Sequence, residues 1–200
     1  FADECYSELY RDVPPPGALE AAKTMGGSAD KVFDKLVVLN SLSKRSNLAG
    51  LRCGFAAGDP EFLGKWAKFR GLAAPQVPLP NQAVAVRAFG DEAHVEENRR
   101  LYNEKYQIAE RLLAPITGPV TPAAGFFLWL DVSRWADSVS VTRDLWRDAG
   151  VKVLPGAYLA SDQADGSNPG RNFIRVGLCP ERETTEKALV RLANWLGEKS

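Results

Sequence analysis

The sequence contains few cysteines, no long apolar run and no excess of charge of either sign. Its 25 lysine and arginine residues balance 25 aspartate and glutamate residues, which argues against a protein whose main task is to bind nucleic acid or an anionic membrane surface. No stretch approaches the ~18–20 consecutive apolar residues that a membrane-spanning helix needs. The three cysteines are widely separated, so they fit free thiols in a reducing compartment better than a disulfide scaffold.

The composition is otherwise typical of an ordinary globular protein. Hydrophobic residues make up 45% and charged residues 25% of the 200 residues, which is enough to build a core in one large domain or two small ones. The chain begins at Phe1, and residues 1–4 are typical of the end of a strand whose earlier part is absent. We therefore expect the chain to be the later part of a longer protein.

The hydrophobic pattern in the first half of the chain predicts strands that alternate with helices. Apolar and β-branched runs predict strands at 35–40 and 52–57. Helices are expected at 60–69, 81–89 and 92–113, and the first of these starts at a proline, which suits a first helical turn. This alternation is typical of a parallel sheet, because parallel strands need crossover connections.

The second half predicts a smaller α+β unit. Strands are expected at 126–132, 151–154 and 172–178. A helix at 139–149 ends at a glycine, and the last helix of the chain carries leucines at helical spacing. The fold class predicted from these elements is mixed α/β, with two domains.

Four polar residues follow the ends of predicted strands. Asp3 and Tyr6 follow the strand at the start of the chain, and Ser41 and Lys44 follow the strand at 35–40. Each residue alone is more often a turn former or a solvated loop residue than a functional group. Their positions nevertheless suit a binding site, because ligands of open α/β sheets bind where strands end.

Two arginines add what one kind of chemistry requires. Arg52 follows Lys44 closely in sequence, and Arg175 lies in the predicted strand at 172–178. Pyridoxal phosphate needs a lysine that bonds to its aldehyde carbon, a carboxylate that keeps its ring nitrogen protonated, and cations or hydroxyls for its phosphate. An amino-acid substrate needs a further cation for its carboxylate. The six residues together provide a candidate for each of these parts.

Three short motifs in this set carry a family resemblance: Asp3-x-x-Tyr6, Ser41-x-Ser43-Lys44 and Arg52-x-Gly54. They resemble the signature of the class I aminotransferases, which are fold type I pyridoxal-phosphate enzymes, and the resemblance extends to the last helix. SLSKRSNLAGLRCGF and DEAHVEENRRLYNEKY are most similar to the succinyldiaminopimelate aminotransferase branch. The resemblance implies the C-terminal portion of that fold: part of the large cofactor-binding domain with its long connecting helix over 1–115, and the small α+β domain over 116–200.

The resemblance also implies roles toward the cofactor. Lys44 would bind pyridoxal phosphate covalently and, once a substrate amine has replaced it, would move a proton between substrate and cofactor. Asp3 would pair with the pyridine nitrogen, and Tyr6 would donate to the phenolic oxygen. Ser41 and Arg52 would bind the phosphate group.

Arg175 would bind the α-carboxylate of the substrate as a bidentate pair, by the same resemblance. The family's phosphate-binding glycine turn, its ring-stacking aromatic and an asparagine near the phenolic oxygen lie upstream of Asp3 and have no counterpart here. No metal is expected, since the cysteines lack metal-ligand spacing. The single histidine, His94, is expected to lie on the surface of a charged helix.

The function implied is transamination between glutamate and the 2-oxo form of N-succinyl-diaminopimelate in lysine biosynthesis. A cytoplasmic homodimer is implied with it, with amino acids and 2-oxo acids as substrates and with neither nucleic acid nor membrane as a partner. The alternatives are an alanine or general 2-oxo-acid aminotransferase, a carbon–sulfur lyase on the same scaffold, and an aminotransferase-like sensor domain or inactive fragment without enzymatic activity.

Overall fold

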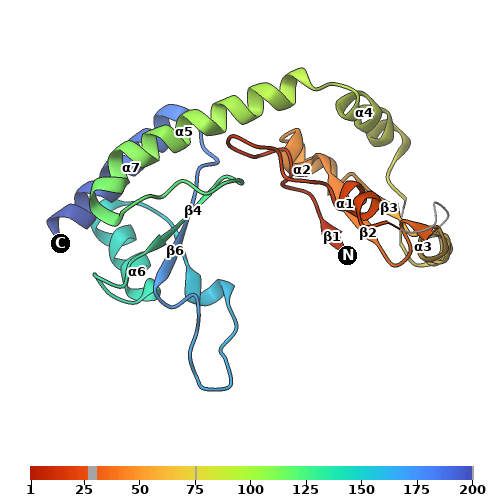
Figure 1. Ribbon diagram of the computed structural model, residues 1–200. Helices are drawn as coiled ribbons and strands as arrows, with labels where there is room; N and C mark the ends of the chain where they lie inside the picture. Colours follow the sequence, from red (N-terminus) through yellow and green to blue (C-terminus); the bar gives the residue numbers. More distant parts are fainter. Residues whose placement is uncertain (27–30, 75, 200) are drawn as a thin grey trace. The chain divides into compact units, whose positions relative to one another are not determined.

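The computed structural model describes residues 1–26, 31–74 and 76–199 (Figure 1). The chain forms two compact units, Phe1–Arg100 and Leu101–Ser200. The division falls inside the long helix α5 (Ala93–Thr117). The domain limits expected from the sequence, between residues 115 and 116, stay a prediction.

A three-stranded mixed sheet forms the centre of the first unit. β1 (Ala2–Asp3) pairs in parallel with β2 (Val37–Ser41), and β2 pairs antiparallel with β3 (Gly54–Gly58). The carboxyl ends of β1 and β2 and the amino end of β3 therefore share one edge. Val37 and Val38 on the central strand are buried.

The antiparallel direction of β3 differs from the parallel alternation that the sequence predicts. Between β2 and β3 lie a 3₁₀ helix of 3 residues, η2 (Ala49–Leu51), and before it the α-helix α2 (Leu42–Arg45), which has only 4 residues. Such a helix rises about 6 Å, whereas a five-residue strand spans about 17 Å. α2 is therefore too short to return the chain along the sheet, and β3 runs back beside β2 instead.

The other α-helices described wholly within the first unit are α1 (Ala18–Thr24), α3 (Pro60–Ala73) and α4 (Leu79–Phe89). α3 starts at the expected proline, and the Oδ1 atom of Asp59 accepts hydrogen bonds from the next turn, including one from Glu61 N at 2.9 Å. α3 runs beyond the predicted end at residue 69, and α4 starts before the predicted residue 81. α1 was not predicted from the sequence.

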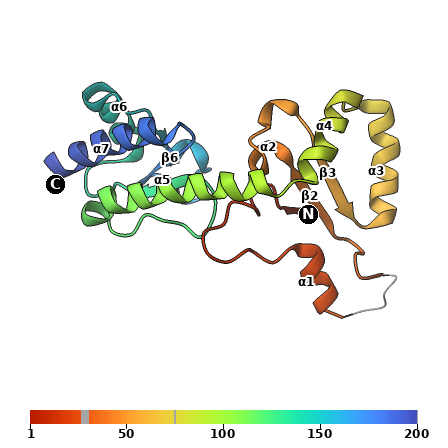
Figure 2. The same cartoon turned by 90° about the horizontal axis from the view of Figure 1, so that it is seen from above.

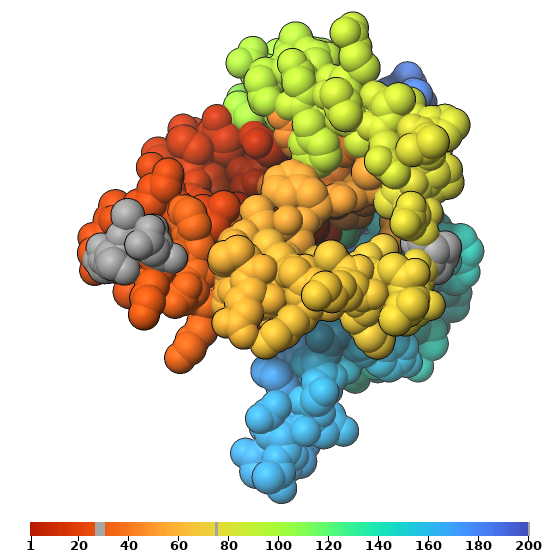
Figure 3. All heavy atoms as spheres, turned by 90° about the vertical axis from the view of Figure 1, so that its right-hand side faces the viewer, coloured from red at the N-terminus to blue at the C-terminus, as the bar shows by residue number. Residues whose placement is uncertain are grey.

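Apolar side chains of the first unit remain exposed on its helices. α3 buries none of its residues, and Phe69 and Leu72 on it are 65% and 94% exposed. On α4, Val86 is 73% exposed. Figure 3 shows α3, in golden yellow, at the surface of this face of the molecule. Most of the hydrophobic burial in the chain lies elsewhere.

The second unit contains an antiparallel sheet and the principal core. β4 (Phe127–Asp131) and β5 (Leu154–Pro155) both pair with β6 (Phe173–Gly177), which lies between them. Alternate residues of β4 and β6 are buried, and they pack with α6 (Ser138–Ala149) and α7 (Arg182–Glu198), seen together in Figure 2. One face of the sheet thus lies on the core.

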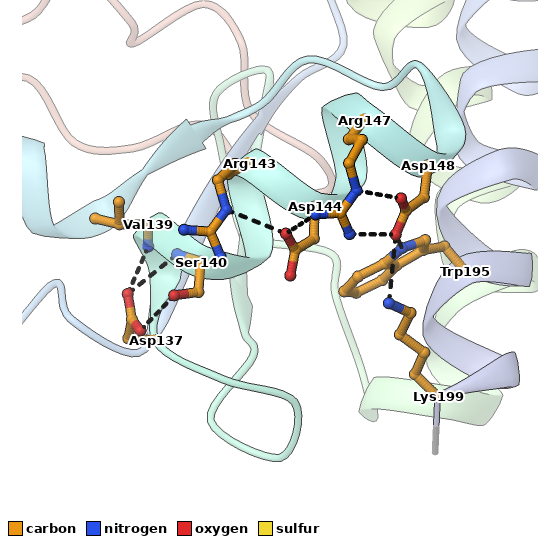
Figure 4. A network of polar contacts seen from close by, with 9 residues as sticks. All are labelled: Asp137, Val139, Ser140, Arg143, Asp144, Arg147, Asp148, Trp195 and Lys199. Carbon is orange, nitrogen blue, oxygen red and sulfur yellow. Dashed lines mark hydrogen bonds and ion pairs between the residues drawn. The ribbon is translucent and has the colours of Figure 1, made fainter.

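A polar network joins α6 to α7 at the surface of the second unit (Figure 4). Asp137 caps α6 by accepting hydrogen bonds from Val139 N and Ser140 N at 3.0 and 3.1 Å. Near the other end of α6, Asp148 accepts hydrogen bonds from Trp195 of α7 and from Lys199, which immediately follows α7, each at 3.4 Å. Hydrogen bonds to a charged group thus connect the two helices.

Two expectations for the second half differ from the structure. The predicted strand at 151–154 is wrong: β5 is only 2 residues long, although Val151 and Val153 before it are buried. α5 continues past the predicted end at residue 113 and includes Pro115. Because proline has no N–H, Pro115 costs the helix the bond to the carbonyl of Arg111, near the end of the helix. In the same turn the Thr117 hydroxyl donates to Leu113 O at 3.1 Å. Among the described helices, none is both long and apolar enough to cross a membrane.

Candidate active site

The sheet of the first unit brings three sequence motifs to one edge. Asp3 pairs with Leu39 in the parallel ladder, and Ser41, at the end of β2, lies opposite Gly54 at the start of β3. The backbone N–H of Leu42 donates to the carbonyl of Cys53 at 3.2 Å. The segments that follow β1 and β2 and the segment that precedes β3 therefore meet there, the last of them because β3 runs antiparallel to β2.

Lys44 lies on α2. This helix starts immediately beyond this edge (Figure 1). Ser41 caps the helix, with its Oγ accepting a hydrogen bond from Ser43 N at 3.3 Å. Leu42 is fully buried and fixes the helix to the sheet. The Lys44 side chain is half-buried, and its Nζ lies 6.0 Å from the centroid of the Tyr6 ring. The structure thus brings the lysine and the tyrosine of the predicted site together.

Cys5 connects Asp3 with Ser41. The backbone N–H of Cys5 donates to Asp3 Oδ1 at 3.0 Å, and its side chain hydrogen-bonds both Asp3 and Ser41. Burial, and then the bond to Asp3, raises the pKa of the Cys5 thiol, while the charge of Lys44 acts weakly in the opposite direction. Cys5 was not among the predicted site residues. Its position between Asp3 and Tyr6 is the only sequence signal that could have indicated it.

Asp3 presents an ionised carboxylate at the same edge. Its side chain is exposed, and hydrogen bonds from the side chain and then the backbone of Cys5 lower its pKa below the ordinary value of 3.8. A carboxyl group of this kind carries a full negative charge at neutral pH. It is therefore suited to pair with a protonated ring nitrogen.

The two arginines near Lys44 have different environments. Arg45 is 5% exposed, forms an ion pair with Glu92, and lies 3.9 Å from a carboxylate oxygen of Glu8. Its Nη1 also donates to Ala88 O at 3.3 Å. Arg45 therefore joins α2 to the segments around it, which leaves Arg52 as the phosphate-binding candidate.

Arg52 is exposed at the start of the segment that leads into β3. Its Nη1 donates to the carbonyl of Ala49 at 3.0 Å. Its backbone has a φ of 54°, in the left-handed region that non-glycine residues seldom adopt. Such backbone strain persists only when the surrounding structure imposes it, and it clusters at functional sites.

Arg175 lies in the second unit, whereas the other five predicted site residues belong to the first unit. It occupies the middle of β6, opposite Trp129 on one side and Leu154 on the other. Its neighbours in sequence face the core, so its half-buried side chain lies on the other face of the sheet. The guanidinium carbon lies 4.4 Å from the centroid of the Phe127 ring, which holds the cation by a cation–π contact.

The residues at the edge of the first sheet fit pyridoxal phosphate chemically. They provide an amine for the aldehyde, an ionised carboxylate for the ring nitrogen, and a hydroxyl and a guanidinium for the phosphate. Among the described residues, no group of histidines, cysteines and carboxylates could hold a metal ion. His94, expected at the surface, is half-buried, and its Nε2 lies 2.8 Å from Ser46 Oγ.

Comparison with known proteins gives consistent matches over nearly the whole chain. It is 35% identical over 95% of its length to the 4-dedimethylamino-4-oxo-anhydrotetracycline transaminase OxyQ of Streptomyces rimosus, and it covers 49% of that protein. It is 28% identical over 96% of its length to an LL-diaminopimelate aminotransferase of Dehalococcoides mccartyi, covering 47% of it.

A solved structure and a family model agree with these relatives. The crystal structure of an aminotransferase from Neisseria meningitidis superposes with a TM-score of 0.88 and 39% identity, over 97% of this chain and 48% of that one. The chain thus spans about half the length of the relatives it matches. The family model of the class I and II aminotransferases matches residues 1–192. The chain therefore belongs to the class I and II aminotransferases, a family of pyridoxal-phosphate-dependent enzymes with the type I fold.

Proposed function

We propose that this chain carries the lysine-bearing part of an aminotransferase site, in which an amino group moves from an amino acid to a 2-oxo acid. The observation that supports this most directly is the meeting of Asp3, Ser41 and Lys44 at one sheet edge, with Cys5 bonded to both Asp3 and Ser41. Because the chain spans about half the length of its relatives, the activity proposed is that of the complete gene product.

Lys44 is the proposed covalent anchor and proton carrier. Pyridoxal phosphate, when bound, supplies an electron sink for the electrons released at the substrate α-carbon. The Lys44 amine accepts a proton from one carbon and returns it to another, which requires its Nζ to stay within reach of both. Asp3 holds the ring nitrogen protonated through an ion pair, and Tyr6, beside Lys44, donates to the phenolic oxygen.

Ser41 and Arg52 are the proposed phosphate ligands, and Arg175 is the proposed ligand of the substrate α-carboxylate. A guanidinium suits both anions because its planar fork donates two parallel hydrogen bonds. The ring of Phe127 beneath Arg175 limits the directions that its guanidinium can adopt. Arg175 would therefore orient the substrate as well as bind it.

The substrate we propose is N-succinyl-diaminopimelate, with glutamate and 2-oxoglutarate as the other amine and 2-oxo acid pair. The sequence resemblance supports this choice, and a relative that is 28% identical is by its name an LL-diaminopimelate aminotransferase. Turnover of N-succinyl-diaminopimelate, LL-diaminopimelate and alanine should be compared at equal concentrations. A preference for alanine would refute the substrate but leave the proposed aminotransferase activity intact.

We further propose that the complete protein is a cytoplasmic homodimer, as the family resemblance implies. Light scattering of the purified protein would give the mass of the assembly. A monomer that turns over substrate at the full rate would contradict this part of the proposal.

The proposed function is tested by fixing the cofactor on the protein. The complete gene product is incubated with pyridoxal phosphate, reduced with borohydride and digested, and the labelled peptide is identified by mass. We expect the label on Lys44, and we expect a Lys44→Ala variant to lose both label and turnover. Lys65→Ala is the matched control, because Lys65 is exposed and pairs with Glu61 on its own helix. A wild-type protein that binds no label at Lys44 would contradict the proposed function.

A further inference from the structure

A buried amide from α5 is bonded to the helix that carries Lys44. Asn98 is 7% exposed, and its Nδ2 donates to the carbonyl oxygens of Lys44 at 3.2 Å and Arg45 at 3.4 Å. Its Oδ1 accepts a hydrogen bond from Asn47 Nδ2 at 2.8 Å. Every one of these bonds thus goes to α2 or to the residues that immediately follow it.

α2 needs such partners because of its length. The last four carbonyl groups of any helix lack partners within the helix, and α2 has only 4 residues. The chain then leaves the helix through Asn47, whose φ of 53° lies in the left-handed region. The Asn98 amide satisfies carbonyls that the helix itself leaves unpaired, and Asn47 in turn fixes which way that amide points.

Two other contacts hold the same turn, but they act on different atoms. His94 Nε2 lies 2.8 Å from Ser46 Oγ, and Arg45 pairs with Glu92. Both contacts involve side chains of residues that follow Lys44. Among the hydrogen bonds described for this turn, the one from the Asn98 amide is the one that α5 donates to the backbone of Lys44 itself.

We propose that Asn98 is a positioning residue for Lys44. By fixing the peptide group of Lys44, it fixes the direction in which the side chain leaves the helix, and hence where Nζ lies relative to a bound cofactor. This inference rests on the proposed function of Lys44. Loss of the Asn98 hydrogen bonds should slow the steps that use Lys44 Nζ, and it should leave the binding of the substrate carboxylate unchanged.

The test replaces the Asn98 amide with a carboxylate. Asn98→Asp keeps the shape of the side chain and the acceptor for Asn47, but it removes both N–H donors and turns an anion toward the carbonyls of Lys44 and Arg45. In the complete gene product loaded with pyridoxal phosphate, we expect kcat to fall by about tenfold or more, since small misplacements of reacting groups have effects of that size. We expect KM for the amino acid to change by less than about threefold, because the groups that bind the substrate equally in the ground state and the transition state are unchanged.

A second readout does not depend on turnover. The rate at which borohydride fixes pyridoxal phosphate on Lys44 should fall in Asn98→Asp, as measured by the mass of the Lys44 peptide over time. Gln107→Glu is the matched control, because it makes the same amide-to-carboxylate change on an exposed part of the same helix. Gln107→Glu should leave the kcat, the KM and the labelling rate at their wild-type values.

The outcomes separate this inference from the proposed function. If the wild-type protein is not labelled at Lys44, the proposed function fails. If Lys44 is labelled at the wild-type rate in Asn98→Asp and kcat is unchanged, the inference is overturned while the function stands. If Asn98→Asp does not fold, Asn47→Gly decides: it keeps the left-handed turn but removes the bond that orients the amide. A lower kcat with unchanged KM would then support the inference, and an unchanged kcat would overturn it.

Discussion

The thiol of Cys5 lies between a carboxylate and a hydroxyl of the candidate site. Because burial and the bond to Asp3 raise its pKa, less of it is thiolate at neutral pH than of an unperturbed cysteine, and thiolate is the reactive form. Cys179 is exposed. With iodoacetamide at pH 7.5, we expect Cys179 to be alkylated several times faster than Cys5, as followed by peptide mass. Equal rates would show that Cys5 is not held as the structure describes.

A conservative change at Arg175 tests how it binds an anion. Arg175→Lys keeps the positive charge but loses the planar fork and its contact with the Phe127 ring. We expect KM for the amino acid to rise about tenfold, equivalent to ~1.4 kcal/mol of binding, while labelling of Lys44 by the cofactor stays unchanged. Arg171→Lys, at an exposed neighbouring position, should alter neither. A normal KM in Arg175→Lys would mean that another group binds the carboxylate.

Sequence reasoning identified residues whose position follows from strand ends, and it missed those defined by distant contacts. Asp3 and Ser41 could be placed together because parallel strands end at the same edge of a sheet. Asn98 could not, because its bonds to Lys44 and Arg45 join parts of the chain 54 and 53 residues apart. The buried environment of Arg45 likewise depends on distant residues, Ala88 of α4 and Glu92.

At the scale of elements, prediction succeeded where periodicity or capping was strong. α3 begins at its proline, and α6 ends at Gly150, which has the left-handed φ of 64° expected of a glycine after a helix. The strand expected at 151–154 failed because buried valines in a loop give the same hydrophobic signal as a strand. The direction of β3 could not be read from periodicity at all, since it depends on the length of the connecting helix.

The contact between α6 and α7 should stabilise the fold to an extent that depends on pH. The hydrogen bond from Arg147, followed by those from Trp195 and Lys199, lowers the pKa of Asp148 far below its ordinary value of 3.8. A carboxyl group with a lowered native pKa stabilises the fold above its unfolded pKa, and that contribution is lost as the pH falls below about 3.8 toward the native value.

Replacing the Asp148 carboxylate should therefore lower the stability of the fold more at neutral pH than at acidic pH. Asp148→Asn should lower the melting temperature at pH 7, where the native carboxylate is charged and bonded. The difference from the wild-type protein should shrink as the pH is lowered through 3 toward 2, as measured by thermal unfolding followed by circular dichroism. Glu198→Gln, the same carboxylate-to-amide change at an exposed position of α7, is the control. A difference that is constant with pH would exclude the charge as its cause.

At the scale of the whole molecule, the two units differ in how much apolar surface they bury. The hydrophobic core cluster lies entirely within Leu101–Ser200 and includes side chains with no exposed surface such as Leu128, Ile174 and Leu192. Among its described residues, the first unit buries few large apolar side chains and leaves Phe69 and Leu72 exposed. Burial of apolar surface is the main favourable term in folding. The second unit therefore contains most of what a stable domain requires.

Expressing the two units separately tests this difference. We expect residues 101–200 to unfold cooperatively in urea as one domain, because they carry the core cluster and both sheet partners of β6. Residues 1–100 should bind the dye anilinonaphthalene sulfonate and lack a cooperative transition, since apolar side chains on α3 and α4 are exposed. If residues 1–100 instead unfolded cooperatively without binding the dye, the sheet and α2 would be stable by themselves. The position of Lys44 would then depend on the first unit alone, and no cover over the exposed face of α3 would be needed to maintain it.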